Sequence, residues 1–155
     1  MENITEHIHK SLIKNNKTVA TAESCTGGIL SSLLTQFSCS SKYFNLGVIT
    51  YNNQAKESIL KIPAPIIAKY GAVSKNIASL MAKNIRQIAK TDFGISITGI
   101  AGPTGATLNK PVGTVFIAVT NKSKIICKKF IFQGNRTSIR KQSALKALQL
   151  LKQIL

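Results

Sequence analysis

The chain has 155 residues, 44% of them hydrophobic, and this length suits one domain whose core needs no disulfide or metal. Lys and Arg number 21 against 5 Asp and Glu, which gives a formal net charge of +16. The chain has no run of about 18 apolar residues and its three cysteines lie far apart, which excludes a membrane span, a disulfide framework and a cysteine zinc site. Because the N-terminus is also unlike a secretory signal, we expect a cytoplasmic protein with a single domain over residues 1–155.

The high positive charge is typical of proteins that bind nucleic acid, and it would also attract an anionic substrate. The lysines, however, are spread over all the predicted helices. The longest basic run is Lys128-Lys129, and no aromatic residues that could stack on bases are interleaved with it. We therefore do not expect specific nucleic-acid recognition.

Hydrophobic periodicity and turn residues predict helices that alternate with short strands in the first part of the chain. Ser74 is the expected N-cap of the longest of these helices. In chain order the predicted elements are a helix at 4–15, a strand at 18–22, a helix at about 26–36, a strand at 46–51, a helix at 52–60 and, after a stretch punctuated by prolines, a helix at 74–90.

The remaining part of the chain predicts three strands and a closing helix. A strand at 93–98 runs into a glycine-rich loop, and strands at 112–120 and 124–132 are joined as a hairpin. An amphipathic helix from about residue 135 closes the chain. Because helices alternate with strands early and an antiparallel pair comes late, we expect a three-layer α/β/α sandwich with a mixed, mostly parallel sheet.

Two predicted strands run into loops rich in glycine and hydroxyl side chains. In open α/β sheets, ligands bind beyond the carboxyl ends of strands, where such loops gather. Gly27 and Gly28 open a helix, and bare N–H groups at a helix start can hold an anion or oxyanion. Gly99 and Gly102 in the later loop allow a similarly close backbone approach. The segments concerned are 18–28 and 95–105, and together they predict a ligand site.

Candidate bases and nucleophiles are few. The only histidines, His7 and His9, lie near the N-terminus, so lysine is the natural base if the chain is a hydrolase. Lys56 follows the second strand on a short helix, and its pKa would be lowered if it were partly buried there. Ser24 occupies a strand-to-helix turn, which exposes a side chain, while Cys25 has no histidine near it in the sequence and ranks below the serines.

Arginine is rare in this lysine-rich chain. Arg136 and Arg140 are four residues apart at a helix start, so they share one helix face. Guanidinium groups suit a phosphate better than ammonium groups do. The pair therefore predicts a phosphate contact, with two solvated arginines as the alternative.

Six ordered blocks of sequence carry a specific resemblance. They are Thr21-Ala-Glu-Ser-Cys-Thr-Gly-Gly28, Tyr51-Asn-Asn-Gln-Ala-Lys56, Gly71-Ala-Val-Ser74, Ser96-Ile-Thr-Gly-Ile-Ala-Gly-Pro103, Lys110-Pro-Val-Gly-Thr-Val115 and Gly134-Asn-Arg-Thr-Ser-Ile-Arg140. In order and spacing they resemble the CinA C-terminal domain family, whose members are also described as nicotinamide-nucleotide amidases. The resemblance runs from about residue 6 to the end of the chain.

This resemblance implies a three-layer α/β/α fold, a homo-oligomer, and hydrolysis of nicotinamide mononucleotide to nicotinic acid mononucleotide and ammonia without metal or organic cofactor. It also implies a serine–lysine dyad, carried over here to Ser41 and Lys56. Tyr51 and Thr98 map onto supporting positions of the pocket. The residues expected to bind the nucleotide are Ser24, Gly27, Gly28, Gly99, Gly102, and Arg136 or Arg140 at its phosphate.

Two alternatives stay open at this point. Ser24 competes with Ser41 as nucleophile, because both lie in plausible loops and spacing does not choose between them. Cys39 precedes the Ser-Ser pair where the family commonly has glycine, and the loop after Pro103 lacks the family's usual acidic residues. The alternative function is a catalytically silent nucleotide-binding protein or a DNA-associated accessory protein of the same family.

Overall fold

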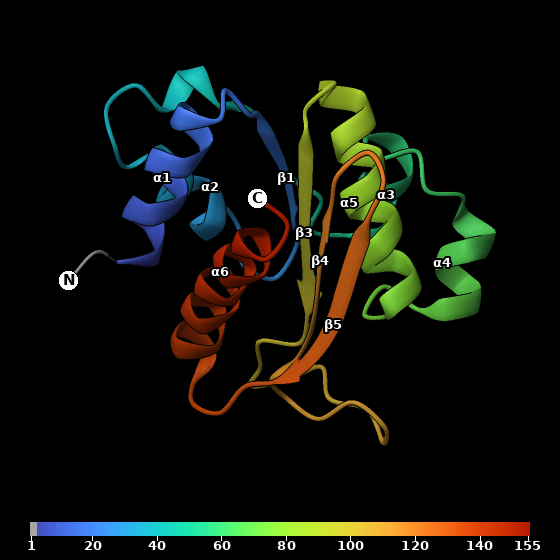
Figure 1. Ribbon diagram of the computed structural model, residues 1–155. Helices are drawn as coiled ribbons and strands as arrows, with labels where there is room; N and C mark the ends of the chain where they lie inside the picture. Colours follow the sequence, from blue (N-terminus) through green and yellow to red (C-terminus); the bar gives the residue numbers. More distant parts are fainter. Residues whose placement is uncertain (1–2) are drawn as a thin grey trace.

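The computed structural model describes residues 3–155 as a sheet between two layers of helices (Figure 1). Its elements are α1 (Ile4–Lys14), β1 (Val19–Glu23), α2 (Ile29–Thr35), the short 3-10 helix η1 (Ser40–Lys42), β2 (Phe44–Ile49), α3 (Asn53–Ser58), α4 (Ala64–Tyr70), α5 (Lys75–Ala89), β3 (Phe93–Gly99), β4 (Thr114–Thr120), β5 (Ile125–Ile131) and α6 (Arg136–Lys152).

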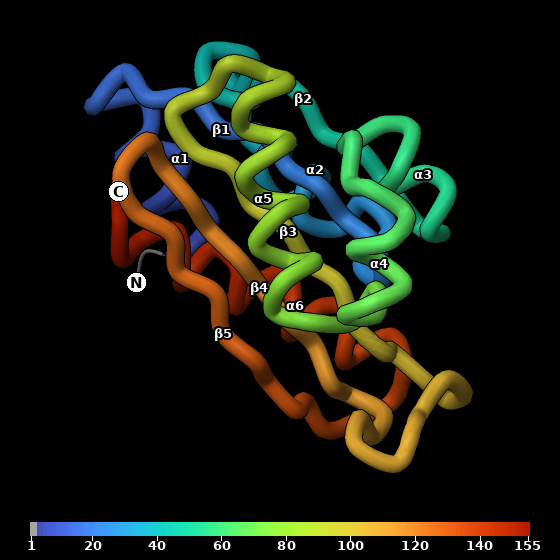
Figure 2. The backbone as a smooth tube through the Cα atoms, turned by 90° about the vertical axis from the view of Figure 1, so that its right-hand side faces the viewer, coloured from blue at the N-terminus to red at the C-terminus, as the bar shows by residue number. Residues whose placement is uncertain are grey.

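The five strands form one mixed sheet in the order β2-β1-β3-β4-β5. β1 pairs in parallel with β2 and β3, whereas β4 is antiparallel to both β3 and β5. Helices α1, α2 and α6 cover one face and α3, α4 and α5 the other (Figures 1 and 2). The predicted three-layer sandwich with a mixed sheet is thus confirmed, although only two of the four strand pairings are parallel.

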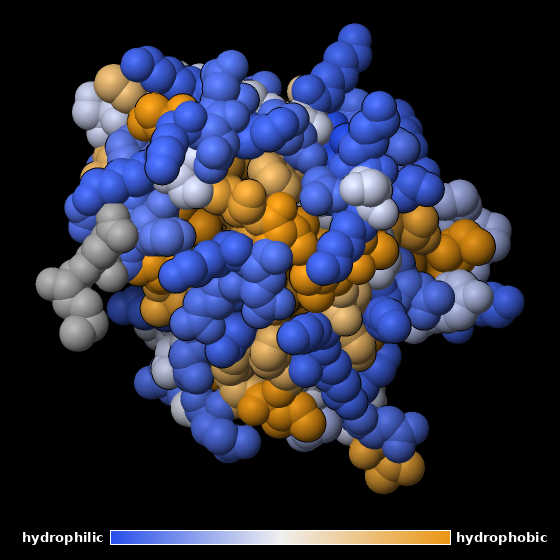
Figure 3. Space-filling view, viewed as in Figure 1, coloured by the Kyte–Doolittle hydropathy of each residue, from blue (hydrophilic) through white to orange (hydrophobic). Residues whose placement is uncertain are grey.

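The core lies on both faces of the two central strands. All of β1 and nearly all of β3 are buried, because each carries helices above and below. One apolar cluster joins α1 and α6 to the sheet, around Leu12 and Leu148, and a second lies under α5, around Met81. Hydrophilic residues cover most of the face in Figure 3, with an apolar band in its centre. Within residues 3–155, no helix is long and apolar enough to cross a membrane.

The register of the parallel strands places one set of strand ends at a single edge. Glu23, the last residue of β1, pairs with Ile49 of β2 and Ile97 of β3. The segments that follow these three strands therefore begin at the same edge of the sheet. In Figure 1 β3 runs into its glycine-rich loop at the lower end of the molecule.

The stretch punctuated by prolines contains a helix of its own. α4 begins directly after Pro63 and includes Pro65 in its first turn, where proline needs no hydrogen-bond partner for its missing N–H. It ends at Gly71, whose φ of 77° is in the left-handed region. The prolines thus start this helix, whose end at Tyr70-Gly71 the sequence pattern indicates as a helix stop.

Candidate functional site

The turn between β1 and α2 is built around the carboxylate of Glu23. This side chain is fully buried. It accepts hydrogen bonds from the amides of Gly28 (3.1 Å), Leu30 (3.1 Å) and Ser31 (2.8 Å), and from Ser31 Oγ (2.7 Å). A carboxylate at a helix N-terminus satisfies the bare N–H groups and complements the helix dipole. Glu23 therefore holds the turn in one conformation, a role that the sequence analysis missed.

The amides of the Gly27-Gly28 turn are engaged within the chain. Gly28 donates to Glu23, and the Gly27 amide donates to the carbonyl of Ser24 at 3.0 Å. Both glycines have positive φ, 56° and 104°, which L side chains rarely adopt. The expectation that this turn binds an anion is not met, because its donors already have acceptors.

We expect Glu23→Gln to lower the free energy of unfolding by about 3 kcal/mol, because the amide nitrogen of glutamine would face buried N–H donors. Urea unfolding, monitored by circular dichroism, measures this loss. Ser31→Ala is the matched control: it removes one of the four bonds to Glu23 and the 2.9 Å hydrogen bond between Ser31 Oγ and Thr21 Oγ1, and it should cost about 1 kcal/mol. A Glu23→Gln protein as stable as the wild type would contradict this account of the turn.

Lys56 is buried beside the end of β1. It lies on α3, whose N-cap Asn52 accepts from the Ala55 amide at 2.8 Å, and only 1% of its surface is exposed. Its Nζ donates to the carbonyl of Thr50 at 2.7 Å and lies 3.2 Å from Ser24 Oγ. Within residues 3–155 no carboxylate lies within ion-pair distance of it, and burial lowers its pKa.

Ser24 lies between β1 and α2 and meets Lys56 at the aligned strand ends. Its amide donates to the carbonyl of Ile97 at 2.9 Å, which ties the turn to β3. Its side chain is 8% exposed, and Oγ reaches the Tyr51 carbonyl only at 3.5 Å. The structure thus brings together a hydroxyl and a buried amine without a carboxylate partner, the arrangement that activates a serine nucleophile in serine–lysine enzymes.

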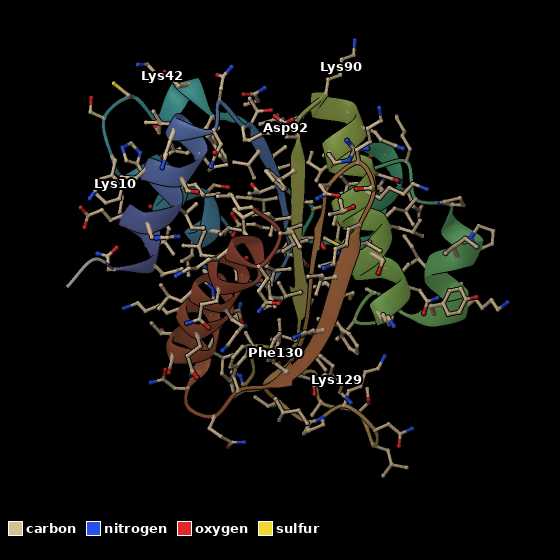
Figure 4. All side chains as sticks on the ribbon, in the orientation of Figure 1. Lys10, Lys42, Lys90, Asp92, Lys129 and Phe130 are labelled. Carbon is tan, nitrogen blue, oxygen red and sulfur yellow. The ribbon has the colours of Figure 1, made fainter. Side chains whose placement is uncertain are left out.

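Ser41 lies elsewhere. It is an exposed residue of η1, which precedes β2, whereas Lys56 follows β2. A strand of this length spans roughly 17–20 Å. Lys42, next to Ser41, lies at the upper end of the molecule in Figure 4, opposite the loop after β3. The expected pairing of Ser41 with Lys56 is therefore corrected: the two residues lie at opposite ends of β2.

A cleft of about 190 Å³ opens next to Ser24. Gly99 and Gly102, both expected to line a pocket, do so from the loop after β3. Lys56 is buried and absent from the lining, and it reaches the cleft through its contact with Ser24 Oγ. The lining residues are Ser24, Cys25, Tyr51, Gly99, Ile100, Ala101, Gly102, Thr104, Gly105 and Arg136.

The two arginines have different partners, although they are four residues apart on α6. Arg136 lines the cleft and donates to the Gly102 carbonyl and to Tyr51 Oη, both at 2.8 Å. Arg140 donates to the carbonyls of Cys25 and Thr26, both at 3.0 Å. Arg140 thus braces the turn after β1, and Arg136 is the arginine that a ligand in the cleft would meet.

Cys25 and Thr98, two other candidate site residues, have surroundings that do not favour a catalytic role. Burial raises the pKa of the Cys25 thiol to about 12, so this cysteine stays protonated and is a poor nucleophile. Thr98 Oγ1 donates to the Ala72 carbonyl at 2.9 Å, so it braces the segment before α5 and does not line the cleft. In the described part of the chain, no three His, Cys, Asp or Glu side chains come together as metal ligands.

The fold and the site define a three-layer α/β/α domain with a buried serine–lysine pair at the carboxyl ends of its parallel strands. The profile of the CinA C-terminal domain family matches residues 1–155, and the chain belongs to that family. This confirms the resemblance seen in the six sequence blocks.

Relatives and solved structures agree with this assignment. A relative from Thermoanaerobacter pseudethanolicus is 47% identical over 154 residues, and a CinA-like protein from Citrifermentans bemidjiense is 42% identical over 154 residues. Each match covers 99% of this chain but 37% of the relative, so the chain spans little more than a third of their length. A CinA superfamily protein from Escherichia coli has a similar structure, with a TM-score of 0.94 and 34% identity over 99% of this chain and 90% of that one. The expected homo-oligomer and cytoplasmic location stay predictions.

Proposed function

We propose that this protein is an amide hydrolase that converts nicotinamide mononucleotide to nicotinic acid mononucleotide and ammonia, with Ser24 as nucleophile and Lys56 as base. The observation that carries the proposal is the buried Lys56 amine, 3.2 Å from Ser24 Oγ and without a carboxylate partner in residues 3–155. Lysine is almost never fully buried without a charged partner, so a lysine buried in this way marks a candidate functional residue.

In the first half of the reaction, neutral Lys56 takes the proton of Ser24 while Oγ attacks the carboxamide carbon. The Thr50 carbonyl, 2.7 Å from Nζ, orients the amine so that its lone pair can face the serine. As the tetrahedral intermediate collapses, the Lys56 ammonium returns the proton to the amide nitrogen. Ammonia leaves, and an ester joins the substrate acyl group to Ser24.

In the second half, Lys56 takes a proton from water, which attacks the ester carbon. Collapse of this intermediate releases the carboxylic acid and returns the proton to Ser24 Oγ. Both intermediates carry an oxyanion. The amide of Cys25, which directly follows the nucleophile and lines the cleft, has no main-chain carbonyl partner within residues 3–155, so it is the proposed oxyanion donor.

The mouth of the cleft suits an anionic pyridine nucleotide. Arg136 supplies a guanidinium for the phosphate, and Tyr51, 57% exposed, offers an aromatic ring beside it. The net charge of +16 would attract such a substrate. No metal or organic cofactor enters the proposed chemistry.

The test is ammonia release from nicotinamide mononucleotide by the purified protein, measured across pH. We expect turnover, and a rate that rises with pH through the lowered pKa of Lys56, because only the neutral amine accepts a proton. A mutant Arg136→Gln should raise KM more than it lowers kcat, since it removes a binding contact.

Absence of ammonia from nicotinamide mononucleotide and related pyridine nucleotides would contradict the proposal. Tight nucleotide binding without turnover would favour the catalytically silent alternative. A rate that falls as pH rises over the same range would contradict the role of Lys56 as base.

A further inference from the structure

A second hollow, of about 470 Å³, lies at the end of the sheet opposite the cleft. It is bounded by the end of α5, the start of β3 and the tip of the β4–β5 hairpin. Figure 4 shows Lys90 and Asp92 at this upper end of the molecule. The lining residues are Lys17, Arg86, Lys90, Thr91, Asp92, Phe93, Asn121, Lys122, Ser123, Ile154 and Leu155.

Cations from separate segments converge on this hollow. Lys17 precedes β1, Arg86 lies on α5, Lys90 follows α5, and Lys122 lies at the hairpin tip. An adjoining hollow of about 230 Å³ shares Arg86 and Lys122 and adds two more lysines, Lys83 and Lys124.

The negative charge at the hollow does not balance these cations. Asp92 is already held by the Thr18 amide at 2.9 Å and by Lys17 at 3.2 Å. Asp92 is the one acidic side chain among the lining residues, all of which lie within the described range 3–155. Within residues 3–155, Lys90 and Lys122 have no ion-pair partner, so the hollow keeps an excess of positive charge.

Arg86 is held in place but poorly satisfied. Its Cβ lies over Gly94 of β3, where an added Cβ would come within 2.7 Å of it. Its Nη1 donates to the Thr91 carbonyl at a long 3.4 Å, and its Nε is buried without any partner. An unsatisfied buried donor is unfavourable, and an acceptor that enters the hollow would relieve it once the guanidinium turned toward it.

The dipole of α5 explains only part of this cluster. Cations are favoured at a helix C-terminus, which accounts for Arg86 and Lys90. Lys17 and Lys122 come from other segments. The hairpin tip that carries Lys122 is fixed by Asn121 Oδ1, which accepts from the amides of Ser123 at 3.0 Å and Lys124 at 2.8 Å.

We propose that this hollow binds a compact polyphosphate anion, such as a di- or triphosphate group, at a site separate from the Ser24 cleft. The volume falls within the usual range of small-molecule sites, about 300–1,000 Å³. A guanidinium fork beside several ammonium groups is the donor set that phosphate groups prefer. The proposal does not depend on the amidase activity.

The experiment is calorimetric titration of the full chain with inorganic triphosphate and, in parallel, with ATP. Arg86→Met keeps the stem over Gly94 and removes the fork, and Lys90→Gln/Lys122→Gln removes two ammonium groups. Each should weaken triphosphate binding about tenfold or more, the effect of one lost charge-assisted contact. The control Lys129→Gln/Lys141→Gln removes the same charge from exposed positions on β5 and α6 outside the lining and should change binding by less than about twofold.

Equal affinity for triphosphate and ATP would support a site for the phosphates alone, and tighter ATP binding would support a site for a nucleotide. Absence of triphosphate binding to the wild-type protein would overturn the proposal. Equal weakening in the control pair would also overturn it, because the net charge alone would then explain the binding. Loss of triphosphate binding in Arg136→Gln would also overturn it, by placing the anion in the Ser24 cleft. So would a short DNA duplex that binds through Arg86 and is not displaced by triphosphate.

Discussion

Lys56→Met is expected to lower the rate of ammonia release from nicotinamide mononucleotide by about 10³-fold or more, while the protein stays folded. The substitution removes the proposed base, and methionine fills the same space without a charge. Since the Lys56 amine is buried without a carboxylate partner in the described chain, its replacement should leave stability unchanged or raise it. Turnover at saturating substrate and urea unfolding measure the two effects.

The matched control is Lys69→Met, which changes an exposed lysine of α4. It should keep the wild-type rate, because Lys69 is exposed, lies over the ring of Tyr70 and does not line the cleft. A Lys56→Met protein that still turns over at a comparable rate would contradict the proposed dyad. A protein that loses both activity and fold would instead show that Lys56 is needed for stability.

The pH dependence of stability gives a second measure of Lys56. Because burial lowers its pKa in the folded protein, the unfolded chain binds more protons between the folded and unfolded pKa values. The free energy of unfolding should therefore rise with pH across that window. It should be lowest below the window, where the folded protein buries the charged amine. In Lys56→Met this contribution should be absent.

Most of the fold could be predicted from the sequence, because helices and strands leave local periodic patterns. The strand at 93–98, for example, was found as Phe93–Gly99, and the helix at 74–90 as Lys75–Ala89. The position of Lys56 on a short helix after β2 also followed from local signals. The depth of its burial did not, since it depends on how α3 packs beside the turn of Ser24.

The choice of serine required topology. Ser24 follows β1 as Lys56 follows β2, and the carboxyl ends of parallel strands meet at one edge. Ser41 precedes β2 and therefore belongs to the opposite edge. This argument needs only the order and direction of the strands, so a predicted parallel pairing of β1 with β2 would have favoured Ser24.

Side-chain partners were the part that sequence could not supply. Glycines at a helix start indicate free amides, but whether Glu23 turns inward to fill them depends on packing. Likewise, Arg136 and Arg140 share a helix face but lie one helical turn apart. Arg136 therefore reaches the cleft, whereas Arg140 reaches the carbonyl of Cys25.

Ser24→Ala should lower ammonia release by about 10³-fold or more, whereas Ser41→Ala should stay within about twofold of the wild type. Ser24 Oγ is the hydroxyl within reach of Lys56 Nζ, and Ser41 is exposed at the far end of β2. Ser24→Ala removes one small polar group and keeps the turn held by Glu23, so the protein should stay folded. Turnover of both variants, measured with nicotinamide mononucleotide at the same protein concentration, distinguishes the two serines.

Substrate binding separates a lost nucleophile from a lost pocket. Calorimetric titration should give Ser24→Ala an affinity for nicotinamide mononucleotide close to that of the wild-type protein, because Arg136 and Tyr51 are unchanged. Full activity in Ser24→Ala combined with its loss in Ser41→Ala would restore Ser41 as the nucleophile. That outcome would require Ser41 of η1 and Lys56 of α3 to be neighbours. The two elements lie at opposite ends of β2, and the parallel pairing of β1 with β2 and β3 fixes that arrangement.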